Sequence, residues 1–225
     1  VGRNMKLKRT WIDGLDEMLG GGLPDKSVIL VEGEPGSGHD LLAQQILYKC
    51  ALKEENVAYF TTQRAPEILR DDFETFGWDI KSLEKTGHWK FIHNHSAKIL
   101  QTLRNEITSM VNKTEWTVID SLSYLLLTHE FKSVLEVVEL LLDETHKHGG
   151  VRFLLLTRGM HDSQTEISLQ HLADGVIDIS AQEAAEGVDR RIRIKKMSKV
   201  VYRQRLIPFN ITERGIVIET AVRIA

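Results

Sequence analysis

The sequence predicts an α/β fold: a doubly wound, mostly parallel sheet flanked by helices, with antiparallel hairpin strands at its C-terminal end. Two patterns support this prediction. Short runs of branched and aliphatic residues alternate with helical patterns through residues 27–172, and such an order gives parallel strands joined by right-handed crossovers. Beyond residue 172, strand-like segments follow one another through short polar turns, which is typical of antiparallel hairpins.

The parallel strands are expected at short apolar runs, because a strand covered on both faces is apolar along its length. These runs are 28–31, 56–61, 89–93, 118–119 with their neighbours, and 151–156. Helical periodicity between them predicts helices at 41–52, 68–76, 99–111 and 134–145. The C-terminal strands are expected at 175–180, 190–197, 202–211 and 215–220. Strand and helix therefore alternate before the hairpins begin.

Length and composition indicate one domain. The chain has 225 residues, of which 42% are hydrophobic, and no segment rich in Pro, Gly and Ser interrupts it. We expect a single domain over 1–225, with a lead-in segment at 1–26, an α/β core at 27–180 and a hairpin extension at 181–225. The segment 134–142 is hydrophobic almost all round, so it is expected to be deeply buried or to lie in a subunit interface.

Charge and hydropathy limit the possible partners. The formal net charge is -3, which excludes a global positive field that would draw the protein to nucleic acid or anionic lipid. No run of about 18 apolar residues occurs, and the basic N-terminal segment lacks an apolar stretch, so we expect a cytoplasmic protein with no membrane partner. The only cysteine, Cys50, lies on an apolar helical pattern and is expected to be a buried structural residue.

A glycine-rich loop follows the first predicted parallel strand, where ligands bind in doubly wound sheets. It reads Gly33, Glu34, Pro35, Gly36, Ser37, Gly38, His39, Asp40. The glycine spacing matches the phosphate-binding loop G-x-x-x-x-G-K-[ST], in which backbone N–H groups converge on phosphates at a helix N-terminus. The two residues with side-chain roles differ, however. His39 stands in the lysine position, and Asp40 stands in the position of the hydroxyl that binds Mg²⁺. A tight turn that only lets strand and helix pack is the alternative.

These two residues lower the positive potential of the loop. A histidine with an ordinary pKa of about 6.5 is mostly neutral at pH 7. An ionised Asp40 adds negative charge, and like charges about 4 Å apart repel by roughly 4 kcal/mol at an effective dielectric constant of about 20. We therefore expect weakened binding of ATP and Mg²⁺ and assign no certain cofactor. Asp40 is expected to interact with the N-terminus of its own helix. A Mg²⁺-binding carboxylate and a His39–Asp40 metal pair are the alternatives.

Several segments resemble the KaiC-like ATPases of the RecA superfamily, and the resemblance covers nearly the whole chain. The segment 11–24 is similar to their lead-in, 171–176 and 208–216 to their late segments, and 116–122 to their Walker B strand. This resemblance implies a RecA-like fold, and it implies that Asp120 would orient Mg²⁺ through water. With a degenerate Walker A motif, Asp120 is the best preserved functional position.

Other positions depart from the family. Its members end the strand after the first helix in paired glutamates that polarise the attacking water, and here Gln63 and Arg64 take those places. Glutamine cannot accept the proton of a water, so a general base worth about 10² to 10⁴ in rate is missing. Arg64 is expected either to form a salt bridge to Asp40, Asp120 or Glu34, or to contact phosphate.

The family also uses a lysine and an arginine, two residues apart, to reach the nucleotide of a neighbouring subunit. Lys196 matches the lysine, whereas Ser198 stands in the arginine position. The resemblance therefore implies a possible trans contact through Lys196 and a homo-oligomer, or assembly with a RecA- or KaiC-type partner protein.

These departures favour an inactive or weakly nucleotide-binding member that acts as a regulatory or scaffold subunit. One alternative is a noncanonical ATPase in which Arg64, Lys196 or Lys199 supplies the missing positive charge. Another is a nucleic-acid-binding recombination accessory protein that uses a basic strip in segment 190–205. The strip comprises Arg190, Arg191, Arg193, Lys195, Lys196, Lys199, Arg203 and Arg205. Only part of it can share one face of a strand.

Two histidine pairs have i, i+2 spacing. His93 and His95 lie at a predicted strand end, and His146 and His148 lie at a helix end. Because no Cys or Asp partners stand near them in the sequence, we expect surface histidines and assign no metal site.

Overall fold

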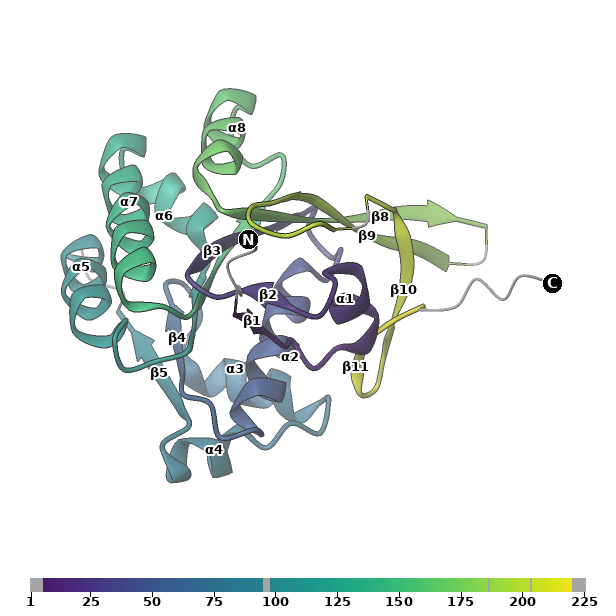
Figure 1. The fold of residues 1–225 in the computed structure, drawn as a ribbon, viewed down its shortest axis with the longest axis horizontal. Helices are drawn as coiled ribbons and strands as arrows, with labels where there is room; N and C mark the ends of the chain where they lie inside the picture. Colours follow the sequence, from purple (N-terminus) through teal and green to yellow (C-terminus); the bar gives the residue numbers. More distant parts are fainter. Residues whose placement is uncertain (1–5, 95–97, 186, 203, 220–225) are drawn as a thin grey trace, which may run out of the picture.

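The computed structural model describes residues 6–94, 98–185, 187–202 and 204–219. Its nine-stranded sheet has the strand order β11-β10-β9-β8-β3-β7-β6-β4-β5 (Figure 1). Six strands, β8-β3-β7-β6-β4-β5, pair in parallel. Beyond β8, the strands β9, β10 and β11 extend the sheet with antiparallel pairs. The sheet and its flanking helices confirm the predicted fold class.

The strands of this sheet are β3 (Ser27–Gly33), β4 (Val57–Thr61), β5 (Trp89–His93), β6 (Trp116–Asp120), β7 (Val151–Thr157), β8 (Gly175–Ala184), β9 (Gly187–Met197), β10 (Ile207–Thr212) and β11 (Gly215–Ile218). The helices are α1 (Asp13–Met18), α2 (His39–Ala51), α3 (Pro66–Glu74), α4 (Ile80–Thr86), α5 (Ile99–Met110), α6 (Leu122–Thr128), α7 (Phe131–His148) and α8 (Ser163–Leu172). In the lead-in, β1 (Leu7–Lys8) pairs antiparallel with β2 (Leu23–Pro24).

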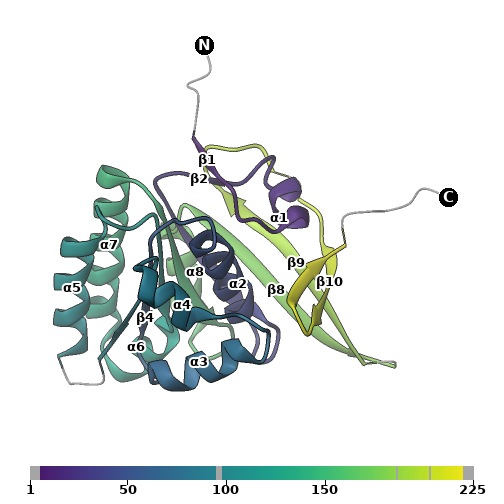
Figure 2. The same cartoon turned by 90° about the horizontal axis from the view of Figure 1, so that it is seen from below.

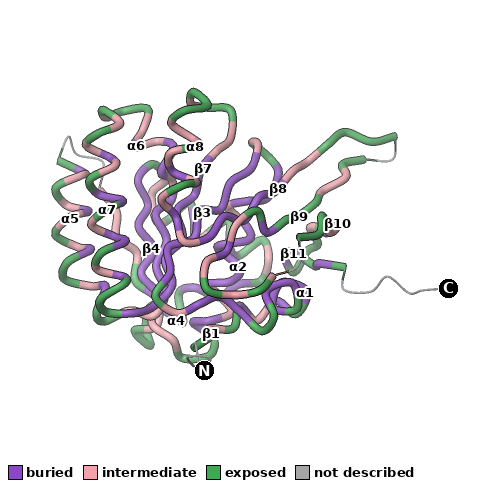
Figure 3. The backbone as a smooth tube through the Cα atoms, turned by 45° about the horizontal axis from the view of Figure 1, so that its top comes forward, coloured by how far each residue is buried: buried purple, intermediate pink, exposed green. Residues whose placement is uncertain are grey.

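Two apolar clusters lie on opposite faces of the sheet (Figure 2). One contains α1, α2, α3 and α4 together with the hairpin strands, and the other contains α5, α6, α7 and α8. The central strands are buried along their lengths, whereas the outer sides of α5, α7 and α8 are exposed (Figure 3). Cys50 is fully buried in the first cluster, as expected for a structural residue. Within the described part of the chain, no helix is both long and apolar enough to cross a bilayer.

The observed helices and strands differ from the sequence-based prediction in two ways. The strand expected at 202–211 is wrong in its first half, because β10 begins only at Ile207 and residues 202 and 204–206 belong to no strand. The helices α1, α4, α6 and α8 and the lead-in strands were not predicted. The helices α1, α4 and α6 have only six or seven residues and the lead-in strands have two, and α8 buries only Leu169, so none of them shows a repeated apolar pattern. Residue 220, the end of the last expected strand, lies outside the described residues.

The helix that follows the glycine-rich loop is fixed to the C-terminal hairpin. Gln45 on α2 donates through Nε2 to the Ile216 carbonyl (3.0 Å), and its Oε1 accepts the Ile216 N–H. Both residues are buried. One side chain thus satisfies the backbone donor and the backbone acceptor of a buried edge-strand residue, which a leucine could not do.

We expect Gln45→Leu to lower the free energy of unfolding by about 2–3 kcal/mol, because two buried backbone groups of β11 lose their partners. Urea denaturation followed by circular dichroism measures this change. Gln101→Leu on α5 is the matched control, since the Gln101 side chain is exposed and bonds to another exposed side chain, Asn105. Equal stability of the two variants would contradict the role of Gln45.

Candidate functional site

The residues singled out in the sequence gather at the carboxyl edge of the parallel strands. The loop 33–40 follows β3, Gln63 and Arg64 follow β4, and Asp120 is the last residue of β6. In the sheet, β7 lies between β3 and β6, and β4 is the next strand after β6. The structure therefore places loop, Walker B residue and the Gln63–Arg64 pair on neighbouring strand ends, where α/β sheets bind ligands.

Glycines allow the loop to keep close contacts with two strands. A Cβ atom at Gly33 would lie 2.8 Å from the Ile179 carbonyl oxygen of β8 and would also overlap the Ser37 hydroxyl. Gly38 has φ +93°, and a Cβ there would lie 3.0 Å from the Ile211 Cδ1 atom of β10. Any other residue at position 38 would be strained by its backbone angle and crowded by Ile211.

Two side chains of the loop point inward. Ser37 is fully buried, and its Oγ lies 3.3 Å from Nδ1 of His39. His39 is only 7% exposed, and burial lowers the pKa of its imidazole although the nearby Asp40, Asp120 and Glu34 carboxylates act in the opposite direction. His39 is therefore neutral at pH 7.

Asp40 turns towards its own helix. Its Oδ1 accepts the Leu41 N–H at 2.9 Å in the first turn of α2. A carboxylate at this end of a helix interacts favourably with the free N–H groups and with the positive end of the helix dipole. This hydrogen bond agrees with the expectation that Asp40 interacts with the N-terminus of its own helix.

Asp120 is buried and engaged in hydrogen bonds. Its Oδ2 accepts the hydroxyl of Tyr59 on β4 and the Nη2 of Arg64 at 3.3 Å. The Tyr59 hydroxyl also accepts Nε2 of Gln44 on α2 at 3.0 Å. Burial raises the pKa of the Asp120 carboxyl group, while the bonds from Tyr59 and Arg64 act in the opposite direction.

Arg64 forms the salt bridge to Asp120 and a second one to Asp72 on α3, with Nη1 to Oδ2 at 2.8 Å. Of the three carboxylates considered from the sequence, the structure selects Asp120 for a direct ion pair with Arg64. Burial opposes the charged guanidinium most strongly, but Asp120, Tyr59, Asp40 and Asp72 together outweigh it and raise the pKa of Arg64. Gln63, by contrast, is exposed.

Glu34 has a partner that sequence reasoning missed. Its Oε1 accepts Nη2 of Arg158, the residue directly after β7, at 2.6 Å. Burial acts most strongly and in the direction that raises the pKa of Glu34, but the hydrogen bond and charge of Arg158, together with backbone hydrogen bonds, leave it lowered. Arg158 also bonds to Asp178 on β8, which Arg193 on β9 contacts as well. The sequence did contain a signal for this contact. Arg158 follows the apolar run 151–156, and the carboxyl end of a parallel strand lies at the same edge of the sheet as the loop.

Lys196 lies elsewhere. It pairs with Val176 near the amino end of β8, which is in register with Leu30 in the middle of β3, before that strand reaches the loop. Its ammonium donates to the carbonyls of Gln170 (3.2 Å), His171 (2.6 Å) and Ala173 (2.6 Å) at the C-terminal end of α8. The structure thus does not bring Lys196 to the loop of its own chain, and a contact to a neighbouring subunit stays a prediction.

The basic strip alternates along β9 as expected. Ile192 and Ile194 are buried, whereas the cations between and beside them are exposed. Each of three cations on that face has a carboxylate partner: Arg191 with Asp189 (2.9 Å), Arg193 with Asp178, and Lys195 with Glu32 (3.3 Å). Arg203 lies outside the described residues. Much of the positive charge of the strip is balanced within the chain.

The histidine pairs do not form a metal site in the described residues, which contain no cluster of three or more His, Cys, Asp or Glu side chains able to hold an ion. His146 pairs with Asp174 at 2.9 Å, and His148 lies 3.4 Å from Glu144. His95 lies outside the described residues.

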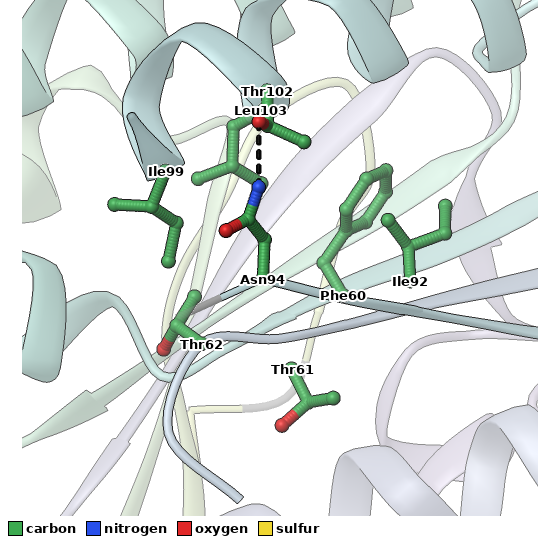
Figure 4. Close-up of a pocket in the computed structure, with 8 residues that line it drawn as sticks. All are labelled: Phe60, Thr61, Thr62, Ile92, Asn94, Ile99, Thr102 and Leu103. Carbon is green, nitrogen blue, oxygen red and sulfur yellow. Dashed lines mark hydrogen bonds between the residues drawn. The ribbon is translucent and has the colours of Figure 1, made fainter. Parts of the chain in front are cut away.

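A small cavity of about 10 Å³ lies beside the end of β4 (Figure 4). At the rim of this cavity, Asn94 donates a hydrogen bond to the Thr102 hydroxyl at 2.7 Å. The cavity has the volume of a single water molecule, so it cannot admit a nucleotide. It is lined by Phe60, Thr61, Thr62, Ile92, Asn94, Ile99, Thr102 and Leu103.

Known proteins share this fold and sequence pattern. A UPF0273 protein of Saccharolobus solfataricus is 27% identical over 96% of this chain and 83% of its own length. One of Methanocaldococcus jannaschii is 27% identical over 95% of this chain and 96% of its own. The crystal structure of a KaiC-like protein from Pyrococcus horikoshii OT3 superimposes with a TM-score of 0.83 and 26% identity, covering 96% of this chain and 99% of the other.

The family model described as "ATPase: KaiC" matches residues 8–223, which is nearly the whole chain. Together with the superposition, this match establishes the RecA-type sheet and the glycine-rich loop after β3 as shared features. The chain therefore belongs to the KaiC ATPase family.

Proposed function

We propose that this chain is a KaiC-type RecA-fold subunit with a regulatory or scaffold role, which binds nucleotide weakly at most and does not turn over ATP. The observation that carries the proposal is the ion pair between Arg64 and Asp120. In the family the carboxylate at this strand end would serve Mg²⁺, but here a guanidinium of the same chain already faces it. Two cations cannot share one carboxylate oxygen without strong repulsion.

The loop residues support the same conclusion. Neutral, buried His39 supplies no charge to a triphosphate, and the Asp40 carboxylate would face the phosphates at short range. Hard Mg²⁺ prefers oxygen ligands. The Asp120 oxygen that bonds to Arg64 and Tyr59 is not free for such a role, so the residues present fit a bound Mg²⁺–triphosphate poorly.

The alternative of a noncanonical ATPase depends on a substitute cation. Arg64 and Arg158 are the cations that the structure places beside the loop, and both form salt bridges to carboxylates. Recruiting either to a phosphate would break these contacts. A nucleic-acid role through the basic strip would likewise have to compete with the carboxylates that face Arg191, Arg193 and Lys195.

Restoring the family side chains should restore binding. We expect the wild-type protein to show no saturation with Mg-ATP below roughly millimolar concentration. The triple variant His39→Lys, Asp40→Thr and Arg64→Gln should bind Mg-ATP at least about tenfold more tightly, because the loop regains positive potential and Asp120 loses its ion pair with Arg64. Isothermal titration calorimetry measures both affinities.

The matched control is His148→Lys with Asp143→Thr and Lys147→Gln on α7. It makes the same changes of charge at three exposed residues, and it should leave the affinity unchanged. Saturable micromolar binding by the wild-type protein, together with phosphate release that Asp120→Ala abolishes, would defeat the proposed function.

The proposal also gives Asp120 a structural role. Asp120→Ala removes the acceptor of the fully buried Tyr59 hydroxyl and the partner of Arg64, so we expect it to lower the free energy of unfolding by about 3 kcal/mol. Thermal or urea denaturation without any nucleotide measures it. Asp143→Ala, at an exposed position, is the control and should change stability by less than about 0.5 kcal/mol. A similar small change for Asp120→Ala would show that the pair contributes little.

A further inference from the structure

Arg64 joins the candidate site to helix α3. Its guanidinium bridges two carboxylates through different nitrogen atoms: Nη2 lies 3.3 Å from Oδ2 of Asp120, and Nη1 lies 2.8 Å from Oδ2 of Asp72. Asp120 is a buried residue at a strand end, whereas the Asp72 side chain on α3 is 51% exposed. A guanidinium is a rigid plane, so its nitrogen atoms move together. A displacement of Arg64 from Asp120 therefore also disturbs its contact with α3.

The helix at the other end of this bridge has few buried side chains. Helix α3 buries only Leu69 and Phe73. It lies beside α4 at the outside of the fold (Figure 2). Two further ion pairs join α3 to this neighbour, namely Arg70–Glu84 and Glu74–Lys81. The ion pair between Arg64 and Asp72 ties the two helices to the carboxyl edge of the sheet.

We propose that α3 holds the site closed through this bridge, which rests on the proposed function in taking the Arg64–Asp120 pair as the obstacle to a bound nucleotide. While Asp72 holds one side of the guanidinium, the other side stays on Asp120. A ligand that displaces the rigid guanidinium from Asp120 makes it give up the Asp72 contact as well. Binding at the site therefore releases α3, and by thermodynamic linkage the release of α3 favours binding.

A double-mutant cycle on the full chain tests this coupling. The background is His39→Lys with Asp40→Thr, which restores positive potential to the loop and keeps Arg64. Adding Asp72→Asn should tighten the binding of Mg-ATP about twofold to fivefold in isothermal titration calorimetry, because binding no longer breaks a partly exposed ion pair. Asp71→Asn is the matched control. It removes the same charge from the neighbouring exposed residue of α3 and should leave the affinity unchanged.

Arg64 has to be present for Asp72 to act on the site. When Arg64→Gln is added to the background, Asp72→Asn should no longer change the affinity. An effect of Asp72→Asn that equals that of Asp71→Asn, or that persists without Arg64, would overturn the role of α3.

Hydrogen exchange tests the same bridge without any nucleotide. In the otherwise wild-type chain, Arg64→Gln should speed exchange of the amides of 66–74 about twofold to fivefold, because α3 loses its tie to Asp120. Arg104→Gln, which removes an ion pair with Glu136 between α5 and α7, is the control and should leave exchange in 66–74 unchanged. Equal exchange in the two variants would contradict the bridge, whether or not any variant binds Mg-ATP.

This inference and the proposed function can fail separately. Micromolar binding of Mg-ATP by the wild-type protein would count against the proposed function, and the effect of Arg64→Gln on exchange in 66–74 would still be measurable. Conversely, an α3 that exchanges equally with and without Arg64 would remove the coupling and leave the weak binding of the wild-type protein as it is.

Discussion

The carboxyl edge of the sheet is organised around one ion pair. Asp120 ends a central strand that is buried on both faces, and a buried carboxylate is costly unless a cation and hydrogen-bond donors face it. Arg64 supplies the cation and Tyr59 supplies a donor. Through Gln44 and Asp72 the same network reaches α2 and α3. Side chains from two strands and two helices are thus linked through one carboxylate.

The strands, the larger helices and the position of the loop could be predicted because local patterns determine them. The apolar run from Val28 to Val31 favours a strand covered on both faces, and in a doubly wound sheet the turn after such a strand lies at the edge where ligands bind. The partners of charged side chains could not be predicted in this way. Arg64 had three candidate carboxylates, and only the relative placement of β4 and β6 selects Asp120. The Arg158–Glu34 contact, between residues far apart in the sequence, depends on the order of β3 and β7.

The two faces of the sheet are covered in different ways. On one face, the lead-in segment and the C-terminal hairpin pack around α2, and Gln45 joins that helix to β11. On the other face, α8 is held mainly at its end, where Lys196 binds three carbonyl groups. A lysine near the C-terminal end of a helix also interacts favourably with the helix dipole. Polar contacts therefore help to position α8, in which Leu169 is buried and Ile167 remains exposed.

The contact between Gly38 and Ile211 constrains how this sequence can diverge. Position 38 is restricted twice, by a left-handed backbone angle and by the isoleucine 3.0 Å from where a Cβ atom would lie. Position 211 is restricted in size by Gly38 and also packs on the apolar cluster of that face. A smaller residue at position 211 would lose some of this packing but would keep the backbone unstrained, whereas the backbone angle at Gly38 would strain any other residue even after Ile211 had become smaller. Variation at this pair is therefore expected to be one-sided.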